Sequence, residues 1–281
     1  MIDRRGMIRI VGMGALGAVL SACGGERTET AATGSLDGSS GTPPVRSEAL
    51  SCAVASSLEK IMPIFSRLFV ENYSLPSPTF QAAASGTLAT QIAEGAPFDL
   101  FLAADSVAMR PLIDAKLVMQ ADIHPVVKTD IVIVARTNRG IVTLDDIRTN
   151  GTKIVVGDAQ VPIGRYTQLL LKAISKRTGD RTFTDAFTQN IVSYEDKAAA
   201  VSQKFFAGDA DVAVLYRSDL YGYDTNDYVV LPLPNKVSLQ STYVSVVLPG
   251  AKQGAIDFVN LLTNPAQAGI WSKYGFRPLG T

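Results

Sequence analysis

The sequence predicts an α/β fold, and three observations support that prediction. From Glu48 onward, short apolar runs alternate with stretches whose apolar residues recur at helical spacing. Glycines close several of the helical stretches, as glycine commonly does at a helix C-terminus. At four points a strand-like run is followed by a few small or polar residues and then by a helix. This order is typical of an open sheet with helices on its faces.

Each strand-like run is short and rich in β-branched or aromatic residues, and each helical stretch places apolar residues three and four positions apart. The expected strands cover residues 49–54, 98–103, 130–135, 153–157, 190–194, 211–216 and 242–248. The expected helices cover residues 88–95, 106–117, 165–179 and 195–208.

The composition excludes several function classes. The chain has 281 residues, of which 47% are hydrophobic, with 26 basic and 26 acidic side chains. Without net charge or a long basic run it lacks the electrostatic footprint of a nucleic-acid-binding protein. The only histidine, His124, has no Ser-His-Asp or metal-ligand companion, so we expect a surface loop residue. We therefore expect no nucleic acid, no enzymatic activity and no cofactor.

Residues 1–23 resemble a bacterial lipoprotein signal peptide. Three arginines precede an apolar run from Ile10 to Leu20, which is too short to span a bilayer. The tetrad Leu-Ser-Ala-Cys resembles a lipobox, and this resemblance implies that Cys23 is lipidated. The arginines fit a twin-arginine signal or an ordinary basic n-region, so the export route stays open. We expect a membrane-anchored lipoprotein in the periplasm or on the outer face of the cytoplasmic membrane.

Residues 24–47 are rich in Gly, Ser, Thr and Pro and contain almost no apolar side chains. We expect a disordered tether between the lipid and the folded domain. Cys52, the only other cysteine, lies in a strand-like run and is expected to be buried there.

The four strand-to-helix junctions form the candidate ligand site. The carboxyl ends of parallel strands face one crevice, where free N–H groups at helix N-termini suit an anion. Local explanations also exist: Ser56 with Glu59 fits a capping box, and Pro63 predicts that the next helix starts late or is kinked. The junctions read "VASSLEK", "AASGTLA", "GDAQVPIGRY" and "SYEDKAA".

Three side chains have two interpretations each: two serines at these junctions, and Tyr216, which ends the strand-like run 211–216. Ser57 and Ser85 either cap helices or offer hydroxyl and N–H groups to a ligand. Tyr216 either belongs to the core or brings its hydroxyl to the site. Carboxylates near strand ends, such as Asp105, are expected to act as caps.

Six segments together resemble the molybdate-binding, solute-capturing subunit of bacterial ABC importers, a family of type II periplasmic binding proteins. The resemblance covers nearly all of the chain after the tether, and its second segment is the most specific. The segments are "ASSLEK", "SGTLATQIAEGAPFDLFLAAD", "VGDAQVPIGRY", "YEDKAAAV", "ADVAVLYRSD" and "NPAQAGIWSKYGF".

The resemblance implies two α/β lobes joined by a two-strand hinge, with the ligand in the cleft between them. Lobe 1 would comprise residues 48–130 and 243–281, and lobe 2 residues 131–242. The crossings are expected near Thr129 to Val132 and near Thr242 to Val246. Such a protein is expected to be a monomer that delivers its ligand to a permease and its ATPase.

The resemblance also implies the roles of five residues in binding molybdate or tungstate. Ser57 and Ser85 would give hydroxyl and N–H groups to the oxyanion, and Tyr216 its hydroxyl. Ile163 and Lys197 match positions that donate only backbone N–H groups. The oxyanion would be held without a directly coordinated cation.

Two of these positions depart from the family pattern and keep alternatives open. Ile163 stands where alanine is usual, and Lys197 stands where a neutral residue is usual. Either side chain could alter the size or charge of the site. The alternatives are a receptor of the same fold for sulfate or a small organic anion, and a lipoprotein or sensor without a transport role.

Overall fold

The computed structural model describes residues 48–149 and 151–280, which form an α/β fold as the sequence predicts. The expected signal peptide, Cys23 and the tether lie outside the described residues. No helix within the described ranges has the length and apolar character needed to cross a membrane.

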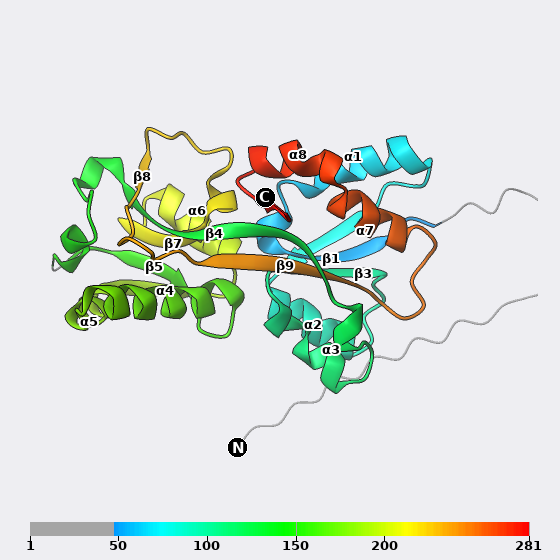
Figure 1. The fold of residues 1–281 in the computed structure, drawn as a ribbon, viewed down its shortest axis with the longest axis horizontal. Coiled ribbons are helices and arrows are strands. Elements are labelled where there is room, and N and C mark those ends of the chain that lie inside the picture. The colour runs from blue at the N-terminus through cyan, green and yellow to red at the C-terminus, as the bar shows by residue number, and fades with distance from the viewer. Residues whose placement is uncertain (1–47, 150, 281) are drawn as a thin grey trace, which may run out of the picture. The chain divides into compact units, whose positions relative to one another are not determined.

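The strands and helices alternate along most of the chain (Figure 1). The strands are β1 (Ser51–Ala55), β2 (Thr79–Ala83), β3 (Leu100–Ala103), β4 (His124–Arg136), β5 (Ile154–Gly157), β6 (Ile191–Glu195), β7 (Val212–Tyr216), β8 (Tyr228–Val230), β9 (Gln240–Val247) and β10 (Arg277–Pro278). The helices are α1 (Met62–Tyr73), α2 (Ser85–Ala93), α3 (Arg110–Asp114), α4 (Pro162–Thr178), α5 (Thr182–Gln189), α6 (Ala198–Ala207), α7 (Ala255–Thr263) and α8 (Ala268–Lys273).

All seven strand-like runs of the sequence are strands, and Cys52 is fully buried in β1. The expected capping box is wrong. Ser56 is the first residue of a 3₁₀ turn and not its N-cap, and its Oγ accepts the N–H of Ala199. The next helix starts late, as predicted, because Pro63 lies in the first turn of α1, where a missing N–H is tolerated. His124 is exposed as predicted, although it begins β4 and does not lie in a loop.

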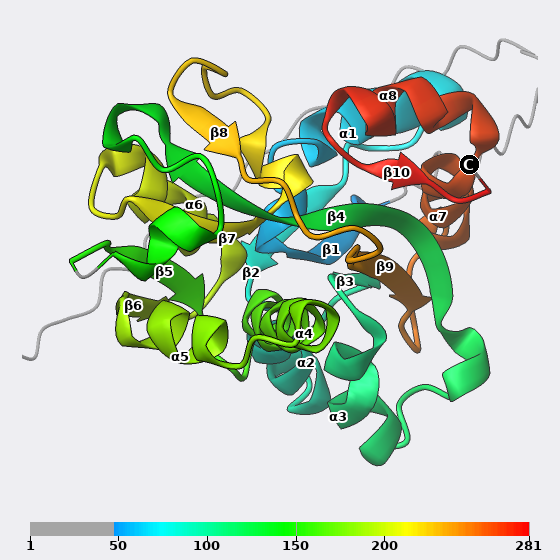
Figure 2. The ribbon, with the colours of Figure 1, turned by 60° about the vertical axis from the view of Figure 1, so that its left-hand side comes forward.

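One long strand, β4, joins two groups of strands (Figure 2). Its residues 124–130 pair with β9, and its residues 131–136 pair with β7 and β8. The full order is β2-β1-β3-β9-β4-β7-β5-β6, and β10 also pairs with β4. The lobe boundaries given above stay a prediction, and we keep lobe 1 and lobe 2 as names for those ranges.

The strand directions bring the two groups of carboxyl ends toward each other. β1 and β3 are parallel to each other and point along β4, because both β3 and β4 are antiparallel to β9. β7 is antiparallel to β4, and β5 is parallel to β7. The strand-to-helix junctions of both groups therefore face the middle of the molecule, which is where a ligand of an open α/β sheet is expected.

Candidate ligand site

A small cavity lies between the facing junctions, and all five candidate residues line it. The volume of this cavity is about 10 Å³. Among the described residues, the rest of the lining includes alanine side chains and no carboxylate. The five candidates are Ser57, Ser85, Ile163, Lys197 and Tyr216.

Two of the candidates are serines that come from lobe 1. Ser85 is the first residue of α2 and is almost fully buried, and its Oγ accepts the N–H of Ala104 at 3.1 Å. Ser57 follows β1, and its Oγ lies 2.6 Å from the Tyr243 hydroxyl. Because Ser85 already accepts a bond, its proton is left to be donated toward the cavity.

Tyr216 is the last residue of β7 and has a buried hydroxyl in need of a partner. Within the described part of the chain, its Oη makes no hydrogen bond although the side chain is 1% exposed. Burial raises the pKa of this phenol well above its ordinary value, so the group keeps its proton and acts as a donor. An unsatisfied buried donor is costly unless a ligand accepts from it.

Three helix N-termini face the cavity, and they explain why Ile163 and Lys197 lie there. Ile163 is the second residue of α4, which has 17 residues, and Lys197 is the N-cap of α6, which has 10. Ser85 begins α2. The first N–H groups of a helix have no partner within it and carry partial positive charge, so they favour an anion.

Two glycines allow α4 to begin so close to β5. A Cβ on Gly164 would lie 1.8 Å from the carbonyl oxygen of Asp158, and one on Gly157 would lie 2.4 Å from the Ile163 side chain. Neither glycine has a positive φ, so lack of space and not backbone conformation selects glycine here. These glycines fix where the Ile163 N–H reaches the cavity.

The family comparison agrees with this arrangement. The family described as bacterial extracellular solute-binding protein matches residues 50–277. The chain belongs to this family. Its fold is that of the type II periplasmic binding proteins: the sulfate-binding protein SubI from Mycobacterium tuberculosis superposes with a TM-score of 0.69 at 15% identity, covering 83% of this chain and 87% of that one.

Proteins with molybdate in their names are among the relatives of this solute-binding protein. Molybdate-binding protein ModA of Mycobacterium bovis is 28% identical over 200 residues, covering 70% of this chain and 72% of that protein. The periplasmic molybdate-binding protein of Azotobacter vinelandii superposes with a TM-score of 0.65 at 15% identity, covering 81% of this chain and 98% of that one. The resemblance to the molybdate-binding family is thus confirmed.

Contacts that the sequence did not reveal also join residues of the two ranges named lobe 1 and lobe 2 in this solute-binding protein. Ser56 Oγ accepts the N–H of Ala199 at 3.4 Å, so this serine bonds to the start of α6 and caps no helix of its own. Lys60 Nζ donates to the carbonyl oxygen of Tyr221 at 2.9 Å, and the rings of Tyr221 and Tyr274 stack 3.8 Å apart. In each of these contacts the two residues are far apart in the sequence, so local patterns could not predict them.

An ion pair adds to these contacts. Asp105 caps the turn that follows β3, as expected, by accepting the N–H of Ala108 at 3.0 Å. Its second carboxylate oxygen accepts from Arg165 Nη2 at 2.7 Å, and Arg165 lies in the second turn of α4. The Asp105 side chain is 7% exposed and that of Arg165 is 28% exposed. The pair therefore links the two lobes beside the cavity, partly shielded from solvent.

Proposed function

We propose that this chain captures molybdate or tungstate outside the cytoplasm and delivers it to the permease and ATPase of an ABC importer. The observation that carries the proposal is the convergence of two serine hydroxyls, the unpartnered Tyr216 hydroxyl and three helix N-termini on one small cavity. The names of the relatives support molybdate as the ligand. Export and a lipid on Cys23 belong to the same proposal.

The donor set favours an oxyanion that carries no proton. Hydroxyl and N–H groups can satisfy every oxygen of a dianion without a formal countercharge. Hydrogen phosphate would have to donate a proton, and the lining offers no carboxylate to accept it. This role requires neither a catalytic base nor a cofactor, so the proposed protein is a binding protein and not an enzyme.

Sulfate is the second candidate ligand, because a sulfate-binding protein shares the fold. Sulfate also lacks a proton at neutral pH, so the type of hydrogen bond does not separate it from molybdate. The size of the closed cavity must separate them, since sulfate is the smaller anion. Ile163, which is larger than the alanine usual at this position, lies where it can set that size.

The proposal is tested by calorimetric titration of the protein with molybdate, tungstate, sulfate and phosphate. We expect one submicromolar site for molybdate or tungstate and no heat of binding with phosphate. Tyr216→Phe should weaken binding by about 10- to 100-fold, the worth of one hydrogen bond to a charged group. It should not lower the melting temperature of the ligand-free protein, because the lost hydroxyl makes no hydrogen bond to any described residue.

Ser85→Ala should weaken binding to a similar degree, whereas Tyr194→Phe, a change in an exposed tyrosine of β6, should have no effect. Binding of sulfate alone would select the second candidate ligand. Binding of none of the four anions, or equal binding by the wild type and Tyr216→Phe, would contradict the proposed site.

The Asp105–Arg165 ion pair should slow ligand release. Asp105→Asn keeps an acceptor for the Ala108 N–H but removes the charge that holds Arg165. A partly buried pair contributes about 1 kcal/mol, so we expect molybdate to dissociate about threefold to tenfold faster in stopped-flow measurements. The association rate should change less, because the pair forms only when the lobes are together.

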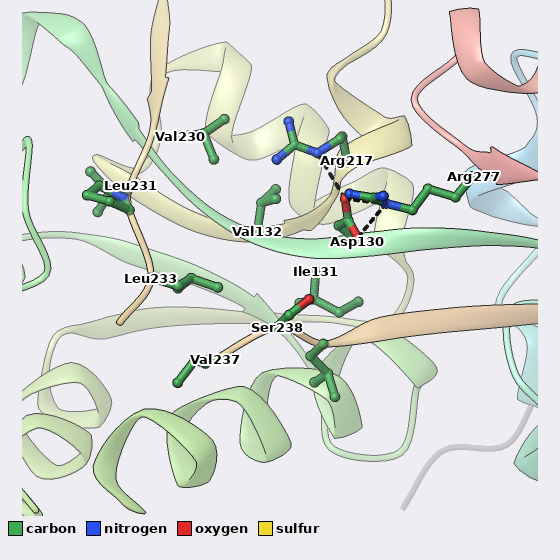
Figure 3. A pocket seen from close by; sticks show the side chains of 12 residues that line it. Asp130, Ile131, Val132, Arg217, Val230, Leu231, Leu233, Val237, Ser238 and Arg277 are labelled. Carbon is green, nitrogen blue, oxygen red and sulfur yellow. Dashed lines mark hydrogen bonds and ion pairs between the residues drawn. The ribbon is translucent and has the colours of Figure 1, made fainter. Parts of the chain in front are cut away.

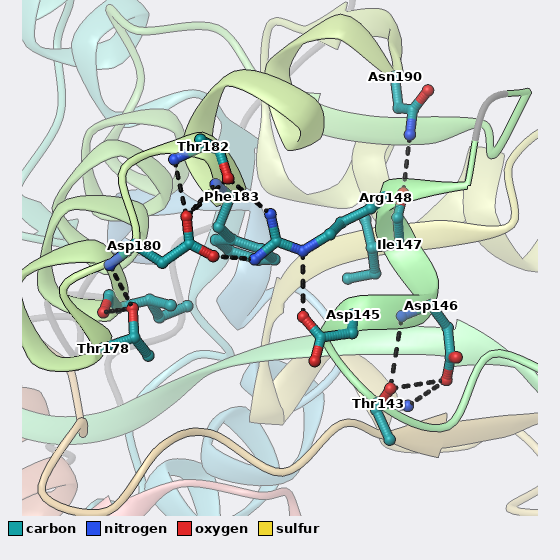
Figure 4. A network of polar contacts seen from close by, with 11 residues as sticks. Thr143, Asp145, Asp146, Ile147, Arg148, Thr178, Asp180, Thr182, Phe183 and Asn190 are labelled. Atoms are coloured by element: carbon teal, nitrogen blue, oxygen red, sulfur yellow. Dashed lines mark hydrogen bonds and ion pairs between the residues drawn. The ribbon is translucent and has the colours of Figure 1, made fainter.

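The matched control is an ion pair that lies within lobe 2 (Figure 4). Asp145 Oδ1 lies 3.0 Å from Arg148 Nε, and Arg148 also pairs with Asp180. Asp145→Asn should leave the dissociation rate unchanged because its pair does not join the lobes. If Asp105→Asn and Asp145→Asn had equal rates, the Asp105–Arg165 pair would have no role in ligand retention.

A further inference from the structure

A second cavity, of about 340 Å³, lies beside the strands that connect the lobes (Figure 3). Residues 130–132 of β4 form one wall, and the segment 230–239, which leads into β9, forms another. Its lining shares no residue with the cavity between the junctions. Its volume falls in the range of about 300–1,000 Å³ that is common for small-molecule sites. We call it the hinge cavity.

One end of the hinge cavity is cationic. Asp130 accepts from Arg277 Nε at 2.9 Å, lies 3.4 Å from Arg217 Nε, and also accepts from Gln240 Nε2 at 3.0 Å. Two guanidinium groups thus share one carboxylate, which leaves one positive charge in surplus. The contacts to Asp130 use the Nε atoms, and the terminal nitrogens of both arginines make no bond to another described residue.

The other end is apolar. Figure 3 shows the Arg217 guanidinium extending toward Val230 and Val132, with the side chains of Leu233 and Val237 beyond them. Two backbone N–H groups of this end are already bonded, that of Leu231 to the Ile133 carbonyl and that of Val237 to the Pro234 carbonyl. Because the side chains of this end are apolar, an occupant would be bound there mainly through apolar contact.

We propose that the hinge cavity binds a small monocarboxylate with a branched aliphatic or aromatic body. The carboxylate would accept from the terminal nitrogens of Arg217 and Arg277, which match carboxylate geometry, and would neutralise the surplus charge. The body would cover the apolar side chains around Val237. An inorganic oxyanion would leave that apolar end unfilled, so the two cavities select different chemistry.

The test is calorimetric titration of the protein with isocaproate and phenylpropionate, in the absence and in the presence of saturating molybdate. We expect saturable binding of both compounds under both conditions. Acetate, which has the charge without the body, and isocaproamide, which has the body without the charge, should each bind at least about tenfold more weakly.

Two substitutions test whether isocaproate binds in the hinge cavity. Arg217→Gln removes a terminal guanidinium, and Val237→Asp adds a negative charge at the apolar end; each should weaken isocaproate binding by about tenfold or more. Arg110→Gln and Val142→Asp, changes at exposed residues elsewhere, should have no effect. An unchanged melting temperature shows that each variant is folded.

Several results would overturn the proposal: no saturable binding of isocaproate, equal binding of isocaproamide, or unchanged binding in both cavity variants. Displacement of isocaproate by molybdate would also overturn it, since the compound would then occupy the cleft. Because binding is first measured without molybdate, the outcome does not depend on which anion the cleft takes.

Discussion

Gly164→Ala is expected to destabilise the protein by about 2–4 kcal/mol and to abolish submicromolar oxyanion binding. The added Cβ would lie 1.8 Å from the Asp158 carbonyl oxygen and 2.6 Å from that of Gly157, and both obstacles are backbone atoms that cannot rotate away. The start of α4 would have to withdraw from β5, and the Ile163 N–H would withdraw with it. Urea unfolding and calorimetric titration measure the two effects.

Gly269→Ala is the matched control, because Gly269 lies in α8 and a Cβ there would meet nothing within 4 Å. That change should leave binding intact and raise stability by up to about 1 kcal/mol, since alanine is the better helix former. If Gly164→Ala unfolded at the same urea concentration as the wild type, close packing of α4 against β5 would not be what requires glycine.

The free energy of unfolding of the wild type is expected to fall as pH rises from about 4 to 7, and that of Asp219→Asn is expected not to fall for this reason. Asp219 is 5% exposed and accepts the Tyr216 N–H at 3.1 Å. Burial raises the pKa of Asp219 from 3.8 to about 7, although the Tyr216 N–H and the Lys60 charge both lower it. The folded protein therefore holds a proton that the unfolded chain has already released.

The sign of the effect follows from that difference. Below about pH 4 the carboxyl is protonated in both states, so the substitution changes little. Between the two pKa values only the unfolded state ionises, and above pH 7 the folded state carries the full cost, up to about 4 kcal/mol. The asparagine amide can still accept the Tyr216 N–H without charge, so the variant should be the more stable protein at pH 8.

Urea unfolding at pH 4.5 and pH 8 checks this, with Asp114→Asn, a change in an exposed residue of α3, as the control. The difference between wild type and Asp219→Asn should grow with pH, and the control should follow the wild type. A difference that stayed constant or shrank with pH would show that the Asp219 pKa is not raised in the folded protein.

The fold was largely predictable because most central strands are continuous apolar runs. β3, β5 and β7 are buried along their whole length, so every position in them is apolar or small. β2 gave no such signal, because it pairs on one side only and none of its five residues is fully buried. β10 has two residues, which is too short for any period to appear.

The candidate site was predictable in place but not in its supporting contacts. The ends of strand-like runs pointed to Ser85 and Tyr216, and the family resemblance chose among the alternatives. Tyr243 has no local mark, since a tyrosine in an apolar strand is an ordinary core residue; only the fold brings its hydroxyl to Ser57, 186 positions away. For Ser56 the local sequence was misleading. Its capping pattern predicted a bond within its own helix, but in the fold its hydroxyl accepts the N–H of Ala199.

The single tryptophan lies in one lobe, and this determines what its fluorescence can report. Trp271 is 2% exposed, its ring centroid lies 4.6 Å from that of Phe65 and 5.2 Å from that of Phe276, and its indole N–H donates to the Leu262 carbonyl at 2.9 Å. All of these residues belong to lobe 1. Tryptophan emission therefore follows the melting of lobe 1 alone, whereas far-ultraviolet circular dichroism follows both lobes. Superimposable curves from the two signals would mean that the lobes melt as one cooperative unit, and separate curves would give the stability of each.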